Sequence, residues 1–127
     1  MDDKERQARG AAVRHKILGN AWVDKSDQSR TAFNAEWYDY LHRGVWSEIW
    51  TRPQLDERTR RVLVLGTMIA LSKWDEFRLH VRAALTEGGL TPDDIKEVIL
   101  QQSAYCGVPA GNNAFREAGL VLQELGK

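Results

Sequence analysis

The amino-acid sequence predicts an all-α protein of about six helices. Apolar residues recur at three- and four-residue steps through most of the chain, as they do on one face of an α-helix. Helix start signals and glycine or proline stops separate these segments. No stretch alternates apolar and polar residues as a half-buried strand does. The 127 residues contain no repeat or linker-like tract, so we expect one domain over residues 1–127, folded as a helical bundle.

Two helices are expected in the N-terminal part. The first is polar, spans Asp2–Leu18, and is stopped by Gly19 and the asparagine after it. Ser26-Asp27 then supplies a start signal for a second helix, whose aromatic and leucine residues keep helical spacing to about Arg43. We expect Gly44 to end this helix, so that a short turn follows it.

The rest of the chain predicts four more helices, separated by strong local signals. The third is apolar nearly all round its second half, which is typical of a helix central to a core or an interface. A threonine, a proline and two acids in sequence form the clearest helix start in the chain. The expected elements are a turn over Trp46–Trp50, a helix capped by Asp56, one over Trp74–Glu87, one from Thr91 toward Tyr105, and one over Ala110–Leu125.

Composition excludes several classes of protein. Eighteen basic and eighteen acidic residues cancel, without a run of one sign, which argues against nucleic acid or an anionic membrane as a partner. The longest apolar run, Val62–Leu71, is too short to span a bilayer. A single cysteine allows no internal disulfide and fits a reducing compartment. We therefore expect a cytoplasmic protein.

The chain is rich in large aromatic side chains for its size. It has five Trp, three Tyr and three Phe. Trp46, Trp50 and Trp74 fall near the ends of predicted helices, where a small monomer covers them poorly. Contacts between subunits or a ligand pocket bury such residues, and we expect both in a homo-oligomer.

The segment Glu76–His80 concentrates a carboxylate, a guanidinium and an imidazole in a helix-patterned stretch. Glu76 and His80 are four residues apart, so on a helix they share a face. An imidazole held by a carboxylate beside the core is suited to proton transfer near neutral pH. The same spacing also fits an ordinary ion pair on a helix surface.

Arginines and amides are the candidate binding groups. Arg52 lies between a tryptophan and Pro53, in a stiff turn where a guanidinium can grip a carboxylate through two hydrogen bonds. Stacking on tryptophan at a subunit contact is the alternative. Arg60 and Arg78 are further candidates, and Asn112 offers either a side-chain amide or a helix cap.

No cofactor or metal site is predicted. The histidines, His15, His42 and His80, fall on three different predicted helices, and no Cys or carboxylate cluster has metal-ligand spacing. Neither a glycine-rich phosphate loop nor a G-x-S-x-G elbow is present. Cys106 lies at a helix C-terminus, where the helix dipole disfavours a thiolate, so burial in the core is the favoured interpretation over a nucleophile.

Taken together, these segments resemble the γ-carboxymuconolactone decarboxylase family over nearly the whole chain. The order and spacing of the matching segments carry the resemblance, since each alone is weak. Two positions depart from it, Asn20 where an acid is expected and Gly111 where alanine is expected. The matching segments are Val13-Arg14 with Leu18-Gly19, Phe33-Asn34, Ile49–Pro53, Leu55, Arg58–Arg60, Glu76 with His80 and Arg82–Ala84, Ile95–Ile99, and Tyr105–Ala110.

The resemblance implies an all-helical subunit of the carboxymuconolactone decarboxylase and alkyl-hydroperoxidase-like type, in a homohexamer or trimer of dimers. It implies a carboxy-lyase that removes CO2 without a cofactor from 4-carboxymuconolactone, a lactone dicarboxylate, giving β-ketoadipate enol-lactone in protocatechuate catabolism. We hypothesise that His80 donates a proton, that Glu76 orients it and favours its charged form, and that Arg52 grips the retained carboxylate. The remaining candidates for substrate binding are Arg60, Arg78, Trp46, Trp50, Tyr105, Cys106 and Asn112.

Two other functions stay open. One is a thiol-dependent peroxidase or disulfide reductase that uses Cys106, although the related hydroperoxide-reducing proteins need a CxxC pair and a nearby histidine. The other is a non-enzymatic helical oligomerisation module, in which the Glu, His and Arg residues form interface ion pairs.

Overall fold

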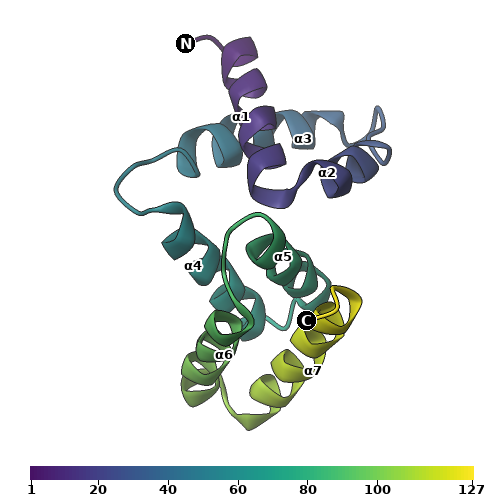
Figure 1. The fold of residues 1–127 in the computed structure, drawn as a ribbon. Helices are drawn as coiled ribbons and strands as arrows, with labels where there is room; N and C mark the ends of the chain where they lie inside the picture. Colours follow the sequence, from purple (N-terminus) through teal and green to yellow (C-terminus); the bar gives the residue numbers. More distant parts are fainter. The chain divides into compact units, whose positions relative to one another are not determined.

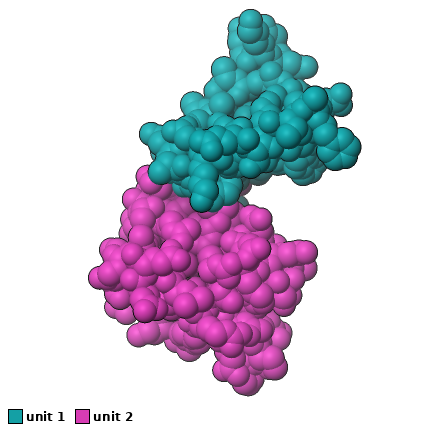
Figure 2. Space-filling view, turned by 90° about the vertical axis from the view of Figure 1, so that its right-hand side faces the viewer, with its two compact units in different colours: residues 1–56 teal, residues 57–127 magenta.

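Every regular element of the protein is helical (Figure 1), so the all-α prediction is confirmed. The computed structural model describes residues 1–127 and contains seven α-helices and one π-helix, against the six helices expected. Contacts within the chain divide it into two compact units, Met1–Asp56 and Glu57–Lys127 (Figure 2). A single domain over residues 1–127 stays a prediction. None of the helices combines the length and the apolar character that a membrane span requires.

Unit 1 is built around the pairing of its first helix with its π-helix. Its elements are α1 (Asp3–Leu18), α2 (Asn20–Asp27), α3 (Ala35–Tyr40) and the π-helix η1 (Leu41–Ile49). A Cβ atom added to Gly10 of α1 would lie 1.8 Å from the carbonyl oxygen of His42 in η1, so the two backbones meet there without an intervening side chain. Arg9 donates to the hydroxyl of Ser47 at 2.9 Å and to its carbonyl at 2.8 Å.

Arg14 holds the helices of unit 1 together from inside. Only 4% of its surface is exposed. Its guanidinium donates to Asp27 at 2.8 Å and to Ser26 at 3.0 Å. It also lies over the rings of Trp22 and Tyr38, at 5.8 and 5.6 Å from their centroids. One side chain of α1 therefore bonds α2 and packs on α3.

The predicted second helix over residues 26–43 is wrong at both ends. Ser26-Asp27 closes α2 instead of opening a helix, because the Asp27 carboxylate bonds Arg14. The start signal lies further along the chain, at Thr31 and Asn34. The Thr31 amide donates to the Asn34 side chain at 2.7 Å, and the Asn34 amide donates to the Thr31 hydroxyl at 3.3 Å. This reciprocal pair is the capping-box arrangement, and it precedes α3.

Gly44 does not end the helix, and Trp46–Trp50 is not a simple turn. The chain remains helical to Ile49 as a π-helix, in which each amide bonds the carbonyl five residues before it. The Trp50 amide, for example, donates to the Val45 carbonyl at 3.1 Å. A glycine inside a helix costs only about 1 kcal/mol. The packing of α1 along η1 offsets that cost, which local sequence does not reveal.

Unit 2 follows the sequence prediction closely. Its helices are α4 (Glu57–Ala70), α5 (Trp74–Thr86), α6 (Pro92–Cys106) and α7 (Val108–Glu124). The last helix begins earlier than predicted, because Pro109 occupies its first turn, where a proline lacks no hydrogen bond. The four helices enclose one apolar core, formed by Leu65, Ile69, Phe77, Val81, Ala84, Leu85, Leu90, Ile95, Ile99, Ala114, Ala118 and Val121.

Polar contacts fix the helix ends of unit 2. Thr91 and Asp94 form a complete capping box at the start of α6. Arg58 of α4 also donates to Asp94 at 2.8 Å, and this bond, with the Thr91 amide, lowers the pKa of Asp94 to about 2. On the other side, Arg82 of α5 bonds Glu124 of α7. These pairs connect neighbouring helices around the apolar core.

We predict that Gly10→Ala destabilises the protein by about 2 kcal/mol or more, because the new methyl group forces α1 away from η1. Gly119→Ala is the matched control, since no atom lies within 4 Å of a Cβ added there and alanine favours the helix. Urea unfolding followed by circular dichroism measures both. Equal stability of the two variants would contradict the close approach at Gly10.

Candidate active site

His80 lies on α5 next to the residues that this helix buries in the core. Phe77, Val81 and Ala84 are fully buried at helical spacing, and His80 is largely buried beside them. Burial, and after it the positive charge of Arg61, lowers the pKa of His80 from 6.5 to about 4. No hydrogen bond within the chain is among the causes. The imidazole is therefore neutral at neutral pH.

The expected pairing of Glu76 with His80 is absent from the structure. Glu76 is exposed, at a shallow surface hollow formed with residues 72–75. Neither a hydrogen bond nor an ion pair connects it to His80, and Glu76 is not among the groups that shift the pKa of His80. The hypothesis that Glu76 favours the charged imidazole is wrong for this chain by itself. A carboxylate in water keeps its hydration, and the low-dielectric surroundings of His80 decide its charge.

Arg61, which the sequence analysis did not select, is the cation that acts on His80. Only 2% of its surface is exposed, and its Nε bonds Glu57 at 3.1 Å, one helical turn away. Its side chain passes closely over Gly88, where an added Cβ would lie 2.4 Å from the Arg61 Nε. A buried guanidinium and a buried imidazole thus belong to the same part of unit 2.

A sequence signal for Arg61 existed. Arg61, Leu65 and Ile69 follow one another at four-residue steps along α4, and all three are buried. An arginine on the apolar stripe of a helix indicates a buried guanidinium. Its neighbour Arg60, which was predicted instead, is half-buried on α4.

Arg78 is engaged by two carboxylates. It bonds Glu117 of α7 and Asp75 of its own helix. The hydrogen bond with Glu117 is the largest cause that raises the pKa of Arg78. The guanidinium therefore connects α5 to α7, and its role in substrate binding stays a prediction.

The predicted residues near the α6–α7 junction lie in varied surroundings. Tyr105 is 83% exposed, Cys106 is half-buried at the last position of α6, and Asn112 is exposed on α7. The glycine that departs from the family pattern has a packing reason: a Cβ added to Gly111 would lie 2.4 Å from the Ser103 hydroxyl oxygen. Gly111 thus allows α6 and α7 to approach closely.

Three predicted residues belong to unit 1. Trp46 and Trp50 stack, with ring centroids 5.4 Å apart and planes at 25°. Trp46 is buried, and Trp50 is half-buried. Arg52 follows η1 in an exposed turn, in which its amide donates to the Ile49 carbonyl at 3.1 Å. The other seven predicted residues are in unit 2: Arg60, Glu76, Arg78, His80, Tyr105, Cys106 and Asn112.

A hollow with a volume of about 580 Å³ lies along α4 and α6 of unit 2. It contains none of the predicted site residues. Most of its wall is apolar, and the ion pair of Arg58 and Asp94 is part of that wall. The residues that line it are Arg58, Val62, Leu63, Gly66, Thr67, Ala70, Leu71, Asp94, Glu97, Val98, Gln101 and Gln102.

The family of this chain follows from its similarity to known proteins. Residues 35–119 match the profile of the "Carboxymuconolactone decarboxylase family". The chain belongs to this family. The match runs from α3 into α7 and includes both His80 and Arg61.

Two relatives with assigned names extend the family comparison. A 4-carboxymuconolactone decarboxylase of Acinetobacter baylyi is 37% identical over 126 residues, which are 99% of this chain and 93% of that protein. A nitrosuccinic acid decarboxylase, npaB, of Metarhizium robertsii is 34% identical over 101 residues, 80% of this chain and 70% of that protein. Both names describe decarboxylases.

We predict that His80 makes the protein less stable as the pH falls below 6.5. In the unfolded chain the imidazole takes up a proton near pH 6.5, whereas in the folded chain it does so only near pH 4. The contribution of this imidazole to the free energy of unfolding is fully present above pH 6.5 and is lost as the pH falls from 6.5 to 4. Between pH 7.5 and 5.0 the loss amounts to about 2 kcal/mol.

Urea unfolding at the two pH values measures this loss. His80→Gln has no imidazole at this position, so its free energy of unfolding falls by about 2 kcal/mol less than that of the unmodified protein over the same pH interval. Parallel pH profiles for the two proteins would show that His80 titrates as in an unfolded chain.

Proposed function

We propose that this protein is a carboxy-lyase that converts 4-carboxymuconolactone into β-ketoadipate enol-lactone and CO2, in the protocatechuate branch of the β-ketoadipate pathway. The observation that carries the proposal is the 37% identity, over 99% of the chain, to a protein named for this decarboxylation. The family match over residues 35–119 supports it independently.

The chemistry of the proposed substrate suits a chain without a cofactor motif. When the C–C bond to the leaving carboxylate breaks, its electron pair flows through the unsaturated ring onto the lactone carbonyl. The ring thus accepts the electrons that a cofactor accepts in other decarboxylations. The protein must hold the retained carboxylate, stabilise the oxyanion and return a proton to a ring carbon.

In this proposal His80 supplies the proton, and Arg61 and the substrate control its charge. The free protein keeps His80 neutral through burial and through the positive charge of Arg61. A bound dianion brings negative charge next to this pair, which opposes the effect of Arg61 and favours the imidazolium. The site therefore takes up a proton from water when the substrate binds.

The proton balance of the cycle then closes. The C–C bond breaks, CO2 leaves, and the electron pair rests on the ring oxyanion. The imidazolium transfers its proton to the ring carbon, which forms the enol-lactone and returns His80 to its neutral state. A proton donor formed only with substrate present also spares the free protein the cost of a buried imidazolium.

The roles of the other predicted residues remain part of the proposal. Arg52 is assigned to the retained carboxylate, because a guanidinium binds a carboxylate through two parallel hydrogen bonds. Arg60, Arg78, Tyr105, Asn112 and Cys106 are assigned to substrate binding, and Trp46 and Trp50 to its apolar walls. Among the arginines of unit 2, Arg61 has the strongest support, because its charge acts on His80.

We also propose that the protein works as a cytoplasmic homohexamer. Apolar side chains along the hollow of α4 and α6 support an assembly of subunits. Leu63 is 55% and Leu71 is 61% exposed there. Exposed leucines that line one apolar hollow are typical of surfaces that other chains cover.

We predict that purified protein consumes freshly generated 4-carboxymuconolactone in an ultraviolet assay with a chelator present. His80→Ala lowers kcat by about 10²- to 10⁴-fold, because it removes the proton donor. Cys106→Ser raises KM at most, because the residue is assigned to substrate binding, and leaves kcat within a few-fold of the unmodified protein, since no chemical step uses the thiol.

Each outcome of this assay has a distinct meaning. No turnover by the unmodified protein would reject the proposed function, and a parallel trial with a peroxide would then test the competing thiol-dependent activity. Near-normal turnover by His80→Ala would reject the role of His80 alone. Loss of activity in Cys106→Ser would favour the thiol mechanism.

We further predict proton uptake upon ligand binding. Titration calorimetry at pH 7 with an unreactive dicarboxylate lactone, in buffers of different ionisation enthalpy, should show close to one proton taken up per site. His80→Gln should show none. Gly88→Ala, which displaces the Arg61 side chain, should change the uptake, whereas Gly119→Ala should not. Binding heats independent of the buffer would contradict the mechanism.

A further inference from the structure

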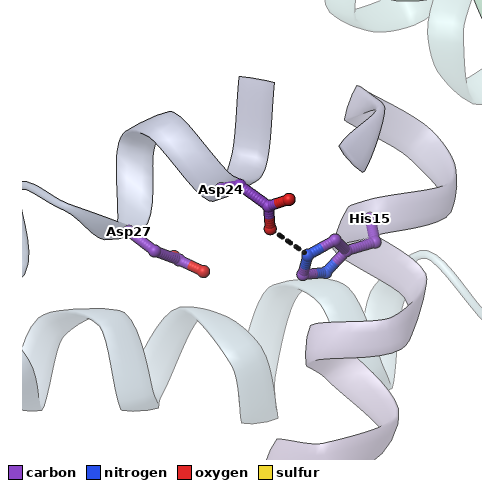
Figure 3. A group of neighbouring side chains, drawn as sticks. All are labelled: His15, Asp24 and Asp27. Atoms are coloured by element: carbon purple, nitrogen blue, oxygen red, sulfur yellow. Dashed lines mark hydrogen bonds and ion pairs between the residues drawn. The ribbon is translucent and has the colours of Figure 1, made fainter. Parts of the chain in front are cut away.

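We propose that His15, Asp24 and Asp27 of unit 1 form a binding site for a divalent transition-metal ion. The ligand atoms of the three side chains all lie within 4.8 Å of one another. Figure 3 shows them converging from two helices, His15 from α1 and the two aspartates from α2. This cluster shares no residue with the proposed catalytic and substrate-binding set, and it does not depend on the proposed function.

The corner between α1 and α2 creates the cluster. α1 ends at Leu18, Gly19 turns the chain with a φ of 91°, and α2 begins at Asn20. His15 thus lies in the last turn of α1, facing a helix that carries Asp24 and Asp27 one turn apart. The Nε2 atom of His15 is 3.3 Å from an oxygen of Asp24. Ligand atoms around one such ion are about 3 Å apart, given metal–ligand bonds of about 2.1 Å.

The imidazole of His15 is held in the orientation that a metal ion needs. Its Nδ1 is 2.9 Å from the carbonyl oxygen of Ala11, which only accepts hydrogen bonds. Nδ1 therefore carries a hydrogen, and in the neutral ring Nε2 has the free lone pair that points toward Asp24. Metal-binding histidines almost always have this second hydrogen bond, commonly to a backbone carbonyl.

A buried residue outside the cluster orients Asp27. Arg14 donates to one oxygen of Asp27 at 2.8 Å and leaves the second oxygen for an ion. Arg14 is itself fixed, because it is buried and lies over the rings of Trp22 and Tyr38. His15 and Asp27 are thus each held by a hydrogen bond to a group outside the cluster, and such bonds orient the ligands of metal sites.

The ligand set indicates the class of ion. One imidazole and two carboxylates suit Zn²⁺, Co²⁺ or Ni²⁺ better than Mg²⁺ or Ca²⁺, which prefer oxygen ligands alone. The nearby charge of Arg14 opposes a cation and weakens the affinity. A bound ion would bond α1 to α2 and stabilise unit 1.

Calorimetric titration of tag-free, chelator-treated protein with ZnCl₂ tests the proposal. We expect one ion per chain and an affinity at least tenfold lower in both His15→Gln and Asp24→Asn. Asp93→Asn is the matched control, because Asp93 is an exposed aspartate on α6. The affinity of this variant for zinc should equal that of the unmodified protein. The temperature of unfolding should rise with ZnCl₂ in the unmodified protein and in the control only.

Cobalt substitution gives an independent spectroscopic test. Co²⁺ bound here should show visible d–d absorption without the intense near-ultraviolet band of a thiolate ligand, because the three proposed ligands include no cysteine. Absence of binding at 1 mM ZnCl₂ (roughly a thousand times a Kd of about 1 μM) would overturn the proposal. Equal affinity in His15→Gln and Asp24→Asn would overturn it as well, since the ion would then bind elsewhere.

Discussion

A guanidinium that is removed from water must be bonded by other groups, and each unit of this protein encloses one. Arg14 in unit 1 and Arg61 in unit 2 are almost fully buried. Asp27 and Glu57 are their respective carboxylate partners. Burying a charge costs several kcal/mol unless it is paired and hydrogen-bonded, so the helices around each arginine have little freedom to rearrange. The positions of α2 against α1, and of the chain near Gly88 against α4, follow from this constraint.

The same constraint connects packing with chemistry in unit 2. Arg61 is required to be charged, and the imidazole of His80 is close enough to be affected by it. A neutral imidazole is the arrangement with the lowest cost in the free protein. It is also unsuited to donate a proton until an anion arrives. The fold thereby makes the charge of His80 depend on a negatively charged ligand, which is a property of the buried pair and not of either residue alone.

The C-terminal helices could be predicted from sequence because their signals are local. The capping box of Thr91 with Asp94, the glycine pair at residues 88–89 and the apolar stripe of α4 act within one or two turns, and they placed three helices nearly correctly. The site was predicted less completely. His80 was selected from its spacing, but its partner was taken to be Glu76, because a pattern along one helix contains no information about Arg61 on another.

The sequence alone determined that the chain is helical, which residues form the helices of unit 2, and to which family the chain belongs. These properties depend on short-range periodicity, helix caps and the order of motifs along the chain. Tertiary structure decided that η1 continues past Gly44, because the contact of Gly10 with His42 joins residues far apart in the chain. It also decided the charge of His80 and the meeting of His15 with Asp24 and Asp27. Burial, and distances between residues on different helices, arise only when the helices pack, and these quantities set the pKa of a side chain and the geometry of a ligand set.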